Sequence, residues 1–345
     1  MFKRKKAELG QPESVMRAVA IEGGKLVPTR MAAKPVAGTG EILVKVAFVG
    51  VNRADILQRE GKYPPPEGAS KLPGLEVSGT IEEIGDGVVG WSVGEEVCAL
   101  LSGGGYAEYV SVPAAQVLSV PSRVSLKEAA SLPEAAATAV MALLLEGRLQ
   151  PRERVLLHGG TSGTGLMIAQ VARALGNPVF ATAGGPEKVA FLKEHGIHGI
   201  DYRAKPFAGQ IMQLTQNEGV DVIIDILGAP QVETHLGLLR RGGRLISLAM
   251  LEGNALESLK ISRMLTHNLH WCGTTLRARN AEQKAEIVAK LRKTVWPQLT
   301  IGSIRPVIDS VFPLEAAEKA HARMESRLHM GKILLEVAQG TGPRV

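Results

Sequence analysis

Apolar and polar residues follow different patterns in the two halves of the chain. From Met16 to about Pro121, short runs of apolar and β-branched residues are separated by glycine and proline, which is typical of strands joined by turns. The strands we expect there are residues 16–21, 41–48, 77–84, 96–101 and 107–111. This half therefore predicts a small β-rich domain, preceded by a polar, flexible extension over residues 1–15.

After Leu132-Pro133 the pattern changes to alternating strands and helices. Residues 135–146 favour a helix, and we expect further helices at 166–175, 186–194, 207–216 and 230–239. The apolar runs between them predict six strands, at 154–158, 179–182, 199–202, 220–226, 244–248 and 270–274. Regular alternation of this kind predicts βαβ units, so we expect an α/β fold with a doubly wound, six-stranded parallel sheet.

The last part of the chain returns to a mixed pattern, with a helix at 281–294 and closing strands near Val307 and Ile333. The 345 residues exceed twice the roughly 150 that one compact domain needs. We therefore expect two domains, a β-rich one formed by residues 16–137 and 276–345 and an α/β one formed by residues 138–275.

Composition narrows the class of protein. Hydrophobic residues make up 45% of the chain and charged residues 21%, which excludes disordered and fibrous proteins. Glycine is frequent, with 39 residues, whereas aromatic residues supply only 4%. A chain of this kind makes many tight turns and close backbone approaches, which folds that bind phosphate groups require.

The net charge of +6 is largely a property of the N-terminal tail. Four of the 40 basic residues stand at positions 3–6, and without them 36 basic residues face 34 acidic ones. Aromatic residues that could stack on bases do not interleave with the positive charge, so we expect no nucleic-acid partner.

The sequence predicts neither membrane insertion nor secretion. The longest uncharged apolar stretch near the middle, residues 135–145, is much shorter than the roughly 20 residues that span a bilayer. The basic start lacks the apolar core of a signal peptide, so we expect a cytoplasmic protein. Two cysteines, Cys98 and Cys272, provide no disulfide framework and no four-cysteine zinc site, although one bridge between them stays possible.

A glycine-rich turn follows the first strand of the α/β half and leads directly into a helix. It resembles the dinucleotide-binding fingerprint G-x-G-x-x-G, in which Gly160 opens the motif and Ser162 replaces the second glycine. Such a turn brings the backbone and the helix N-terminus close to a pyrophosphate, so we expect contacts to Gly160, Ser162, Gly163 and Thr164. The alternative is a glycine-rich turn without a ligand.

The end of the second strand of this half predicts which dinucleotide is bound. An NAD site carries Asp or Glu at this strand end, whereas residues 181–185, including Gly184, contain no carboxylate. A phosphate on the ribose 2′ oxygen would not be repelled, and Lys188 and Tyr202 lie where they could contact it and the adenine. We therefore expect NADPH. The alternative is that Lys188 is a solvated helix residue.

Four motifs carry a resemblance to a known family, at residues 50–55, 59–66, 74–79 and 158–165. The chain resembles the medium-chain dehydrogenase/reductase superfamily from about residue 16 to 337, and within it the zinc-free quinone oxidoreductases related to zeta-crystallin. The resemblance implies that the β-rich part is a GroES-like catalytic domain and that the α/β part is a Rossmann dinucleotide-binding domain.

The resemblance also implies that the protein binds no zinc. Zinc-dependent members carry Cys where Asn52 stands and His where Leu75 stands, and a carboxamide and an alkyl chain cannot replace these ligands. We expect no metal site, and we expect the eight histidines, including the His195/His198 and His267/His270 pairs, to be surface or packing residues.

By the same resemblance, Asn52 and Tyr63 lie beside the nicotinamide, and Asp55 supports their loop; these three are the expected catalytic residues. Tyr63 would donate a hydrogen bond or a proton to the developing hydroquinone, unless it is only an aromatic residue of the rim. The remaining expected cofactor contacts are Thr138, Leu227, Ala249, Met250, Thr275, Leu276, Arg277 and Arg327. For Arg277 and Arg327 a solvated surface charge is the alternative.

These expectations predict an NADPH-dependent, zinc-independent quinone oxidoreductase that acts on a small-molecule quinone or enone. Two alternatives stay open: an NADPH-dependent reductase of enoyl thioesters or enones, and a crystallin-like NADPH-binding protein with little catalysis. The resemblance further implies a homodimer in which the sixth strand, residues 270–274, pairs across a two-fold axis.

Overall fold

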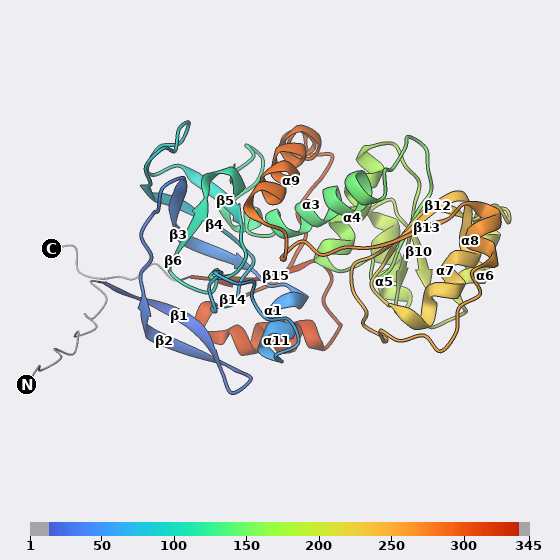
Figure 1. Cartoon of the computed structure of the whole chain (residues 1–345), viewed down its shortest axis with the longest axis horizontal. Helices are drawn as coiled ribbons and strands as arrows, with labels where there is room; N and C mark the ends of the chain where they lie inside the picture. The colour runs from blue at the N-terminus through green and yellow to red at the C-terminus, as the bar shows by residue number, and fades with distance from the viewer. Residues whose placement is uncertain (1–13, 338–345) are drawn as a thin grey trace, which may run out of the picture.

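The computed structural model describes residues 14–337, and its two larger sheets lie toward opposite ends of an elongated molecule (Figure 1). Helices α3 (Pro133–Val140) and α4 (Gly163–Ala174) lie between the two sheets. Most of the expected N-terminal extension, residues 1–13, lies outside the described residues, but its last position, Val15, already begins strand β1. The α/β fold expected from the sequence is confirmed.

The β-rich part is built around one mixed sheet with the strand order β14-β15-β3-β4-β5-β7, and β6 also pairs with β3. Its strands are β3 (Glu41–Gly50), β4 (Glu76–Ile84), β5 (Glu96–Leu100), β6 (Tyr109–Pro113), β7 (Val117–Ser119), β14 (Ile308–Pro313) and β15 (Lys332–Glu336). A separate hairpin, β1 (Val15–Glu22) with β2 (Lys25–Ala33), includes a strand that the sequence pattern did not predict.

Pairing of β15 with β3 brings the end of the chain to the beginning of the candidate site. The two strands are antiparallel, and Leu334 lies opposite Gly50. Because Lys332 is two residues before Leu334 and Asn52 two residues after Gly50, the pairing sets these two side chains close together.

The second sheet is entirely parallel, with the strand order β10-β9-β8-β11-β12-β13. In chain order this is 3-2-1-4-5-6, the doubly wound arrangement of dinucleotide-binding folds. Its strands are β8 (Val155–Leu157), β9 (Val179–Ala183), β10 (His198–Asp201), β11 (Val220–Asp225), β12 (Leu239–Ser247) and β13 (His270–Gly273). Both sheets thus agree with the expected fold, while the proposed domain boundaries stay a prediction.

Several helices differ from the expectation. Helices α5 (Pro186–Glu194) and α9 (Ala281–Thr294) match it, but residues 135–146 form α3 followed by a π-helical segment, η2 (Met141–Glu146). Residues 230–239 divide into a 3-10 turn, η3 (Ala229–Gln231), and α7 (Val232–Leu238). The other helices are α1 (Arg53–Arg59), α2 (Leu126–Ala129), α6 (Phe207–Leu214), α8 (Ser262–His267), α10 (Trp296–Ile301) and α11 (Ala317–Glu325), and the remaining 3-10 turns are η1 (Ala114–Gln116) and η4 (Leu314–Ala316).

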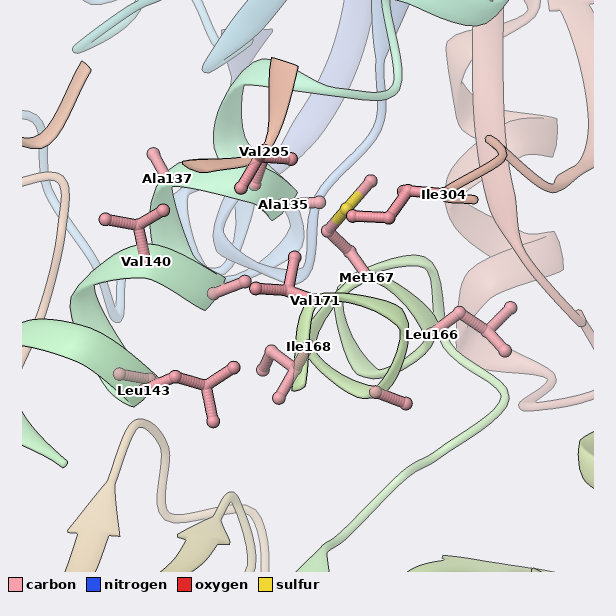
Figure 2. Close-up of a cluster of buried hydrophobic side chains, with 14 of the residues drawn as sticks. Ala135, Ala137, Val140, Leu143, Leu166, Met167, Ile168, Val171, Val295 and Ile304 are labelled. Carbon is pink, nitrogen blue, oxygen red and sulfur yellow. The ribbon is translucent and has the colours of Figure 1, made fainter. Parts of the chain in front are cut away.

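A hydrophobic core joins α3 and α4 (Figure 2). Small side chains of α3, such as Ala135 and Ala137, allow it to lie close to α4, from which Ile168 and Val171 enter the same cluster. Among residues 14–337 no helix is long and apolar enough to cross a bilayer. Cys98 and Cys272 are both free thiols, so the possible bridge between them does not form.

Candidate active site

The loop between β3 and α1 is fixed by the first turn of the helix. Asn52 is the N-cap of α1, and Asp55 three residues later completes a capping box. The Asp55 carboxylate accepts hydrogen bonds from the Asn52 amide at 2.8 Å and from the Gly74 amide at 3.0 Å. It is fully buried, and burial raises its pKa to about 6. Asp55 therefore holds two loops together, and we assign it a positioning role instead of contact with a substrate.

Behind Asp55 lies a buried polar chain that the sequence did not reveal. The Tyr106 hydroxyl lies 3.4 Å from Asp55 Oδ2 and 2.9 Å from Nε2 of His321, a residue of α11. On the other side of the ring, Arg59 lies 3.4 Å from His321 Nδ1. Burial and the neighbouring Arg59 lower the pKa of His321 to about 3, so the ring is neutral and links α11 to α1.

The Asn52 side chain is held by a buried ion pair. Its amide nitrogen donates to Glu76 Oε1 at 3.0 Å, and its oxygen accepts from Lys332 Nζ at 2.8 Å. Lys332 also forms a short salt bridge with Glu76, and all three residues are buried. Buried charges are tolerated only when they are paired and hydrogen-bonded, so this triad is a closed unit.

Glu76 and Lys332 were not among the predicted site residues. The only sequence signal for Glu76 was its place directly after Leu75, in the motif at residues 74–79 that carries the family resemblance. Lys332 is 256 positions away from Glu76, and no local pattern relates it to the site.

The donor set at Asn52 does not fit a zinc ion. The neighbouring position that would have to supply a second ligand is Leu75, which is fully buried, and the Glu76 carboxylate is neutralised by Lys332. Zinc in catalytic sites requires three ligands from Cys, His or carboxylate groups. The residues at this site therefore do not provide a zinc centre.

Arg277 is buried and faces Tyr63. Its guanidinium group donates to Gln58 Oε1 at 2.6 Å, to the Tyr63 carbonyl at 3.2 Å and to the Ser102 carbonyl at 3.0 Å. Only 2% of the residue is exposed, so the alternative of a solvated surface charge is wrong. Because its donors are engaged by protein acceptors, the Arg277 side chain organises the Tyr63 loop and is not free to bind a phosphate.

The guanidinium group of Arg277 forms a cation–π contact with the Tyr63 ring, with 5.5 Å between the guanidinium carbon and the ring centroid. Burial and the nearby Glu134 raise the pKa of the phenol, while Arg277 and the Thr275 side chain act in the opposite direction. Tyr63 is therefore a neutral hydrogen-bond donor near pH 7. The structure thus brings together Tyr63, Thr275 and Arg277, three of the predicted residues.

The glycine turn has the close contacts expected of a phosphate cradle. Gly159 has φ +69°, and a Cβ atom at Gly160 would lie 2.6 Å from the Ala181 side chain. Ser162 is the N-cap of α4 and accepts from the Gly165 amide at 3.0 Å. The next amides, at Gly163 and Thr164, belong to the first turn, whose N–H groups a helix leaves without internal partners. The turn therefore fits a dinucleotide pyrophosphate.

Gly163 also connects the turn to the Asn52 triad. A Cβ atom at this position would lie 2.2 Å from the Cδ atom of Lys332, so the lysine stem runs directly over the glycine. Gly331, the residue before Lys332, donates to the Thr161 carbonyl at 2.8 Å. The first turn of α4 and the loop between β3 and α1, which contains Asn52, thus both pack against the short strand β15.

A second candidate phosphate-binding turn lies at the end of β9, around Gly184. It contains Arg203, which was not among the predicted site residues. A Cβ atom at Gly184 would lie 2.8 Å from the Tyr202 hydroxyl and 2.9 Å from Arg203 Nε. Asp201, the acidic group of this turn, accepts from the Gly185 and Arg203 amides. Arg203 directly follows predicted Tyr202, and that position was the only signal for it in the sequence.

Lys188 and Arg327 meet at the same edge of the sheet. Lys188 Nζ donates to the Arg327 carbonyl at 2.7 Å and to the His329 carbonyl at 3.3 Å. Burial, followed by the charges of Arg203 and Arg323, lowers the pKa of Lys188. The alternative, that Lys188 is a freely solvated helix residue, is therefore wrong. Arg327, in contrast, is exposed.

The remaining predicted cofactor residues follow the carboxyl ends of the parallel strands, where ligands bind in this class of sheet. After β11, the Asp225 carboxylate accepts from the Leu227 amide at 2.8 Å and from Gly228. Met250 after β12 is 61% exposed, whereas Leu276 after β13 is buried in the core. The other two members are Ala249, which is partly buried, and Thr275, which is exposed.

Two buried histidines lie under the glycine turn, where they act as packing residues, as the sequence led us to expect of the chain's histidines. His158 Nε2 lies 2.8 Å from His235 Nε2, and His158 Nδ1 lies 3.0 Å from the Thr182 hydroxyl. Asp225 is 3.9 Å from His235, which makes this the one cluster of possible metal ligands within residues 14–337. Burial lowers the pKa of His158 to about 3 and that of His235 to about 4. The pair is neutral and braces the strands that carry the cofactor contacts.

Comparison with known proteins matches both parts of the chain to one family. Residues 38–122 match the alcohol dehydrogenase GroES-like domain, and residues 163–291 match the domain described as zinc-binding dehydrogenase. The quinone oxidoreductase of Homo sapiens is 30% identical over 336 residues, which cover 94% of this chain and 98% of that protein.

Two further relatives broaden the comparison. The synaptic vesicle membrane protein VAT-1 homolog of Danio rerio is 30% identical over 88% of this chain, which spans 65% of that protein's length. The solved structure of the CurK enoyl reductase superimposes with a TM-score of 0.82 at 27% identity, covering 94% of this chain and all of that one. The strand order, the glycine turn and these similarities agree that the chain belongs to the medium-chain dehydrogenase/reductase superfamily of oxidoreductases.

Proposed function

We propose that this protein is an NADPH-dependent, zinc-independent quinone oxidoreductase. The observation that carries the proposal is the closed triad of Asn52, Glu76 and Lys332, whose donors do not fit zinc. A hydride acceptor in such a site must react without a Lewis acid. A quinone does so because its ring becomes aromatic on reduction.

The arrangement around the two glycine cradles supports NADPH as the cofactor, which supplies the hydride when it is bound. The turn at Gly160 and Ser162 would hold the pyrophosphate. At the end of β9, Arg203, Lys188 and Arg327 would face the 2′-phosphate. Charge-assisted hydrogen bonds contribute about 1.5 to 3 kcal/mol each, so two of them favour NADPH over NADH by about 10² to 10⁴.

The chain's own residues then orient the acceptor. We infer that Tyr63 donates a hydrogen bond to a quinone oxygen, because its phenol is neutral and Arg277 fixes its loop. Asp55 and the Lys332 triad keep Asn52 beside the expected nicotinamide position. Thr138 on α3 keeps accessible surface and would lie near the nicotinamide and its ribose, whereas Leu276, whose side chain is buried in the core, could border the cofactor only through its backbone.

A reductase of enoyl thioesters or enones is the second candidate, and the similarity to the CurK enoyl reductase supports it. A cofactor-binding protein with little catalysis is the third. Steady-state oxidation of NADPH with ortho-quinones, para-quinones and an enoyl thioester separates the three. Turnover with quinones supports the proposal, turnover with the thioester alone supports the second, and tight NADPH binding without turnover supports the third.

We also propose that the protein is a cytoplasmic homodimer. Strand β13 ends the parallel sheet, and among the described strands only β12 pairs with it. Its outer edge offers unpaired N–H and C=O groups, and Trp271 on it is 42% exposed. Light scattering should give twice the 36.6 kDa of one chain, and Trp271→Lys should reduce this mass. A single-chain mass for the unaltered protein would contradict the dimer.

A further inference from the structure

Helix α3 presents two polar side chains on one face. Six of its eight residues are buried, and only Glu134 and Thr138 keep accessible surface. The two are four residues apart, so they lie one above the other on the helix. Figure 2 shows Ala135, Ala137 and Val140 of the same helix within the core shared with α4. Glu134 and Thr138 therefore form the side of α3 that faces away from this core, the side expected to border the cofactor.

The Glu134 carboxyl group is unusual because it has no hydrogen-bond partner among the described residues. Its backbone amide donates to Glu76 Oε2 at 2.9 Å, which places it next to the Asn52 triad. Its own Oε2 atom is enclosed and unpaired. Buried polar atoms are nearly always hydrogen-bonded, so an enclosed carboxyl without a partner calls for an explanation.

Charged groups from several elements surround this carboxyl. Burial and then Glu76 of β4 raise its pKa to about 8, Lys332 of β15 and Lys284 of α9 act in the opposite direction, and Asp55 of α1 raises it further. A negative charge on Glu134 would in turn raise the pKa of Tyr63 and that of Arg277, which lie on the same side of the site. Glu134 is consequently a protonated acid near pH 7.

We propose that Glu134 is the proton donor of quinone reduction, a role that rests on the proposed function. Two-electron reduction of a quinone to a hydroquinone requires one hydride and one proton. As the quinone accepts a hydride from NADPH, the O–H bond of Glu134 breaks and its proton moves to a quinone oxygen. The hydroquinone and NADP⁺ leave, and the Glu134 carboxylate takes a proton from solvent to restore the acid.

Glu134 and Tyr63 have different parts in this step. A general acid works best when its pKa lies near the working pH, which suits Glu134 better than a phenol whose pKa is raised above 10. Tyr63 positions the quinone oxygen by a hydrogen bond, and Glu134 supplies the proton.

Glu134→Gln tests the proposal, because it keeps the shape and removes the acid. We expect kcat with a para-quinone to fall at least about 10²-fold while the NADPH dissociation constant changes less than about twofold. In the unaltered protein, kcat should decrease above about pH 8, and the variant should lose this dependence. Glu286→Gln, on the exposed face of α9, is the matched control and should behave as the unaltered protein.

A second readout needs neither cofactor nor quinone. Infrared difference spectra between pH 6.5 and 9.5 should show one protonated carboxyl that titrates near pH 8 and is missing in Glu134→Gln. Unchanged kcat and pH dependence in the variant, with an active parent, would overturn the donor role alone. A parent inactive with every quinone would overturn the proposed function and the donor role with it.

Discussion

Lys332 donates a 2.8 Å hydrogen bond to Asn52 and so joins two residues that are 280 positions apart in the chain. The same ammonium group neutralises Glu76, and its stem covers Gly163 at the start of α4. One lysine therefore couples the loop expected at the nicotinamide to the turn expected at the pyrophosphate.

Lys332→Met should destabilise the fold. It leaves the Glu76 carboxylate buried without its cation, which costs about 3 to 5 kcal/mol in other proteins. Urea unfolding at pH 7 measures the loss, and Lys332→Met combined with Glu76→Gln should recover much of it. The control is Lys62→Met, since Lys62 pairs with Glu60 on the surface and should matter little. Equal losses in the two lysine variants would contradict the account.

Arg203→Ala should weaken NADPH binding selectively. Loss of one charge-assisted hydrogen bond reduces affinity by roughly 10- to 100-fold, whereas NADH, which has no 2′-phosphate, should lose less than about threefold. Lys188→Glu should likewise weaken NADPH far more than NADH. Fluorescence titration with both nucleotides measures this, and Lys193→Ala on the exposed side of α5 is the control. Equal losses for the two nucleotides would argue against a phosphate site at the end of β9.

Tyr63→Phe should slow turnover and leave cofactor binding intact. The variant removes one neutral hydrogen-bond donor, so kcat with a quinone should fall by roughly 2- to 10-fold. Stopped-flow reduction and NADPH titration measure the two quantities separately. Full activity would remove Tyr63 from the mechanism and leave it an aromatic residue of the rim.

Stability should fall with pH below about 6.5 because of three buried histidines. In the folded chain the pKa values are about 3 for His158 and His321 and about 4 for His235, against 6.5 in an exposed histidine. The unfolded chain therefore binds more protons between about pH 6.5 and these values. Each histidine therefore lowers the free energy of unfolding by up to about 1.4 kcal/mol per pH unit as the pH falls through this range. Asp55 and Glu134, whose folded pKa values are raised to about 6 and about 8, offset part of this decrease, so the net loss is smaller than the sum over the three rings.

Urea unfolding at pH 7.0, 6.0 and 5.0 tests this dependence. His235→Asn should reduce the slope, although it also lowers stability at pH 7, and the exposed His198→Gln should leave the slope unchanged. A stability that does not change between pH 7 and 5 would show that the buried rings do not determine the acid response.

Local signals were sufficient for much of the fold. The bounds of α5 were predictable because Pro186 fits the first turn and Gly196 follows its end. The glycine turn and the strand alternation similarly identified the doubly wound sheet. In contrast, α11 is short and polar along much of its length, and the π-helical turn after Val140 depends on packing instead of residue preference.

The site was predictable only where its residues belong to one motif. Asn52, Asp55 and Tyr63 are close in sequence, and the structure keeps them in one region. Lys332, Glu134 and Arg203 were missed because their relation to the site arises from strand pairing, from one helix face and from a strand end. Arg277 was found by position, but its burial could not be predicted, since its acceptors come from distant parts of the chain, Gln58 in α1 and Ser102 in a loop after β5.

The most direct test of the central claim is quinone-dependent oxidation of NADPH by purified protein whose zinc content has been measured. We expect hydroquinone to form in equal amount to the NADPH consumed, with activity that a chelator does not change and that is at least tenfold lower with NADH. Loss of activity in the chelator, or no turnover with any quinone despite NADPH binding, would contradict a zinc-independent NADPH quinone oxidoreductase.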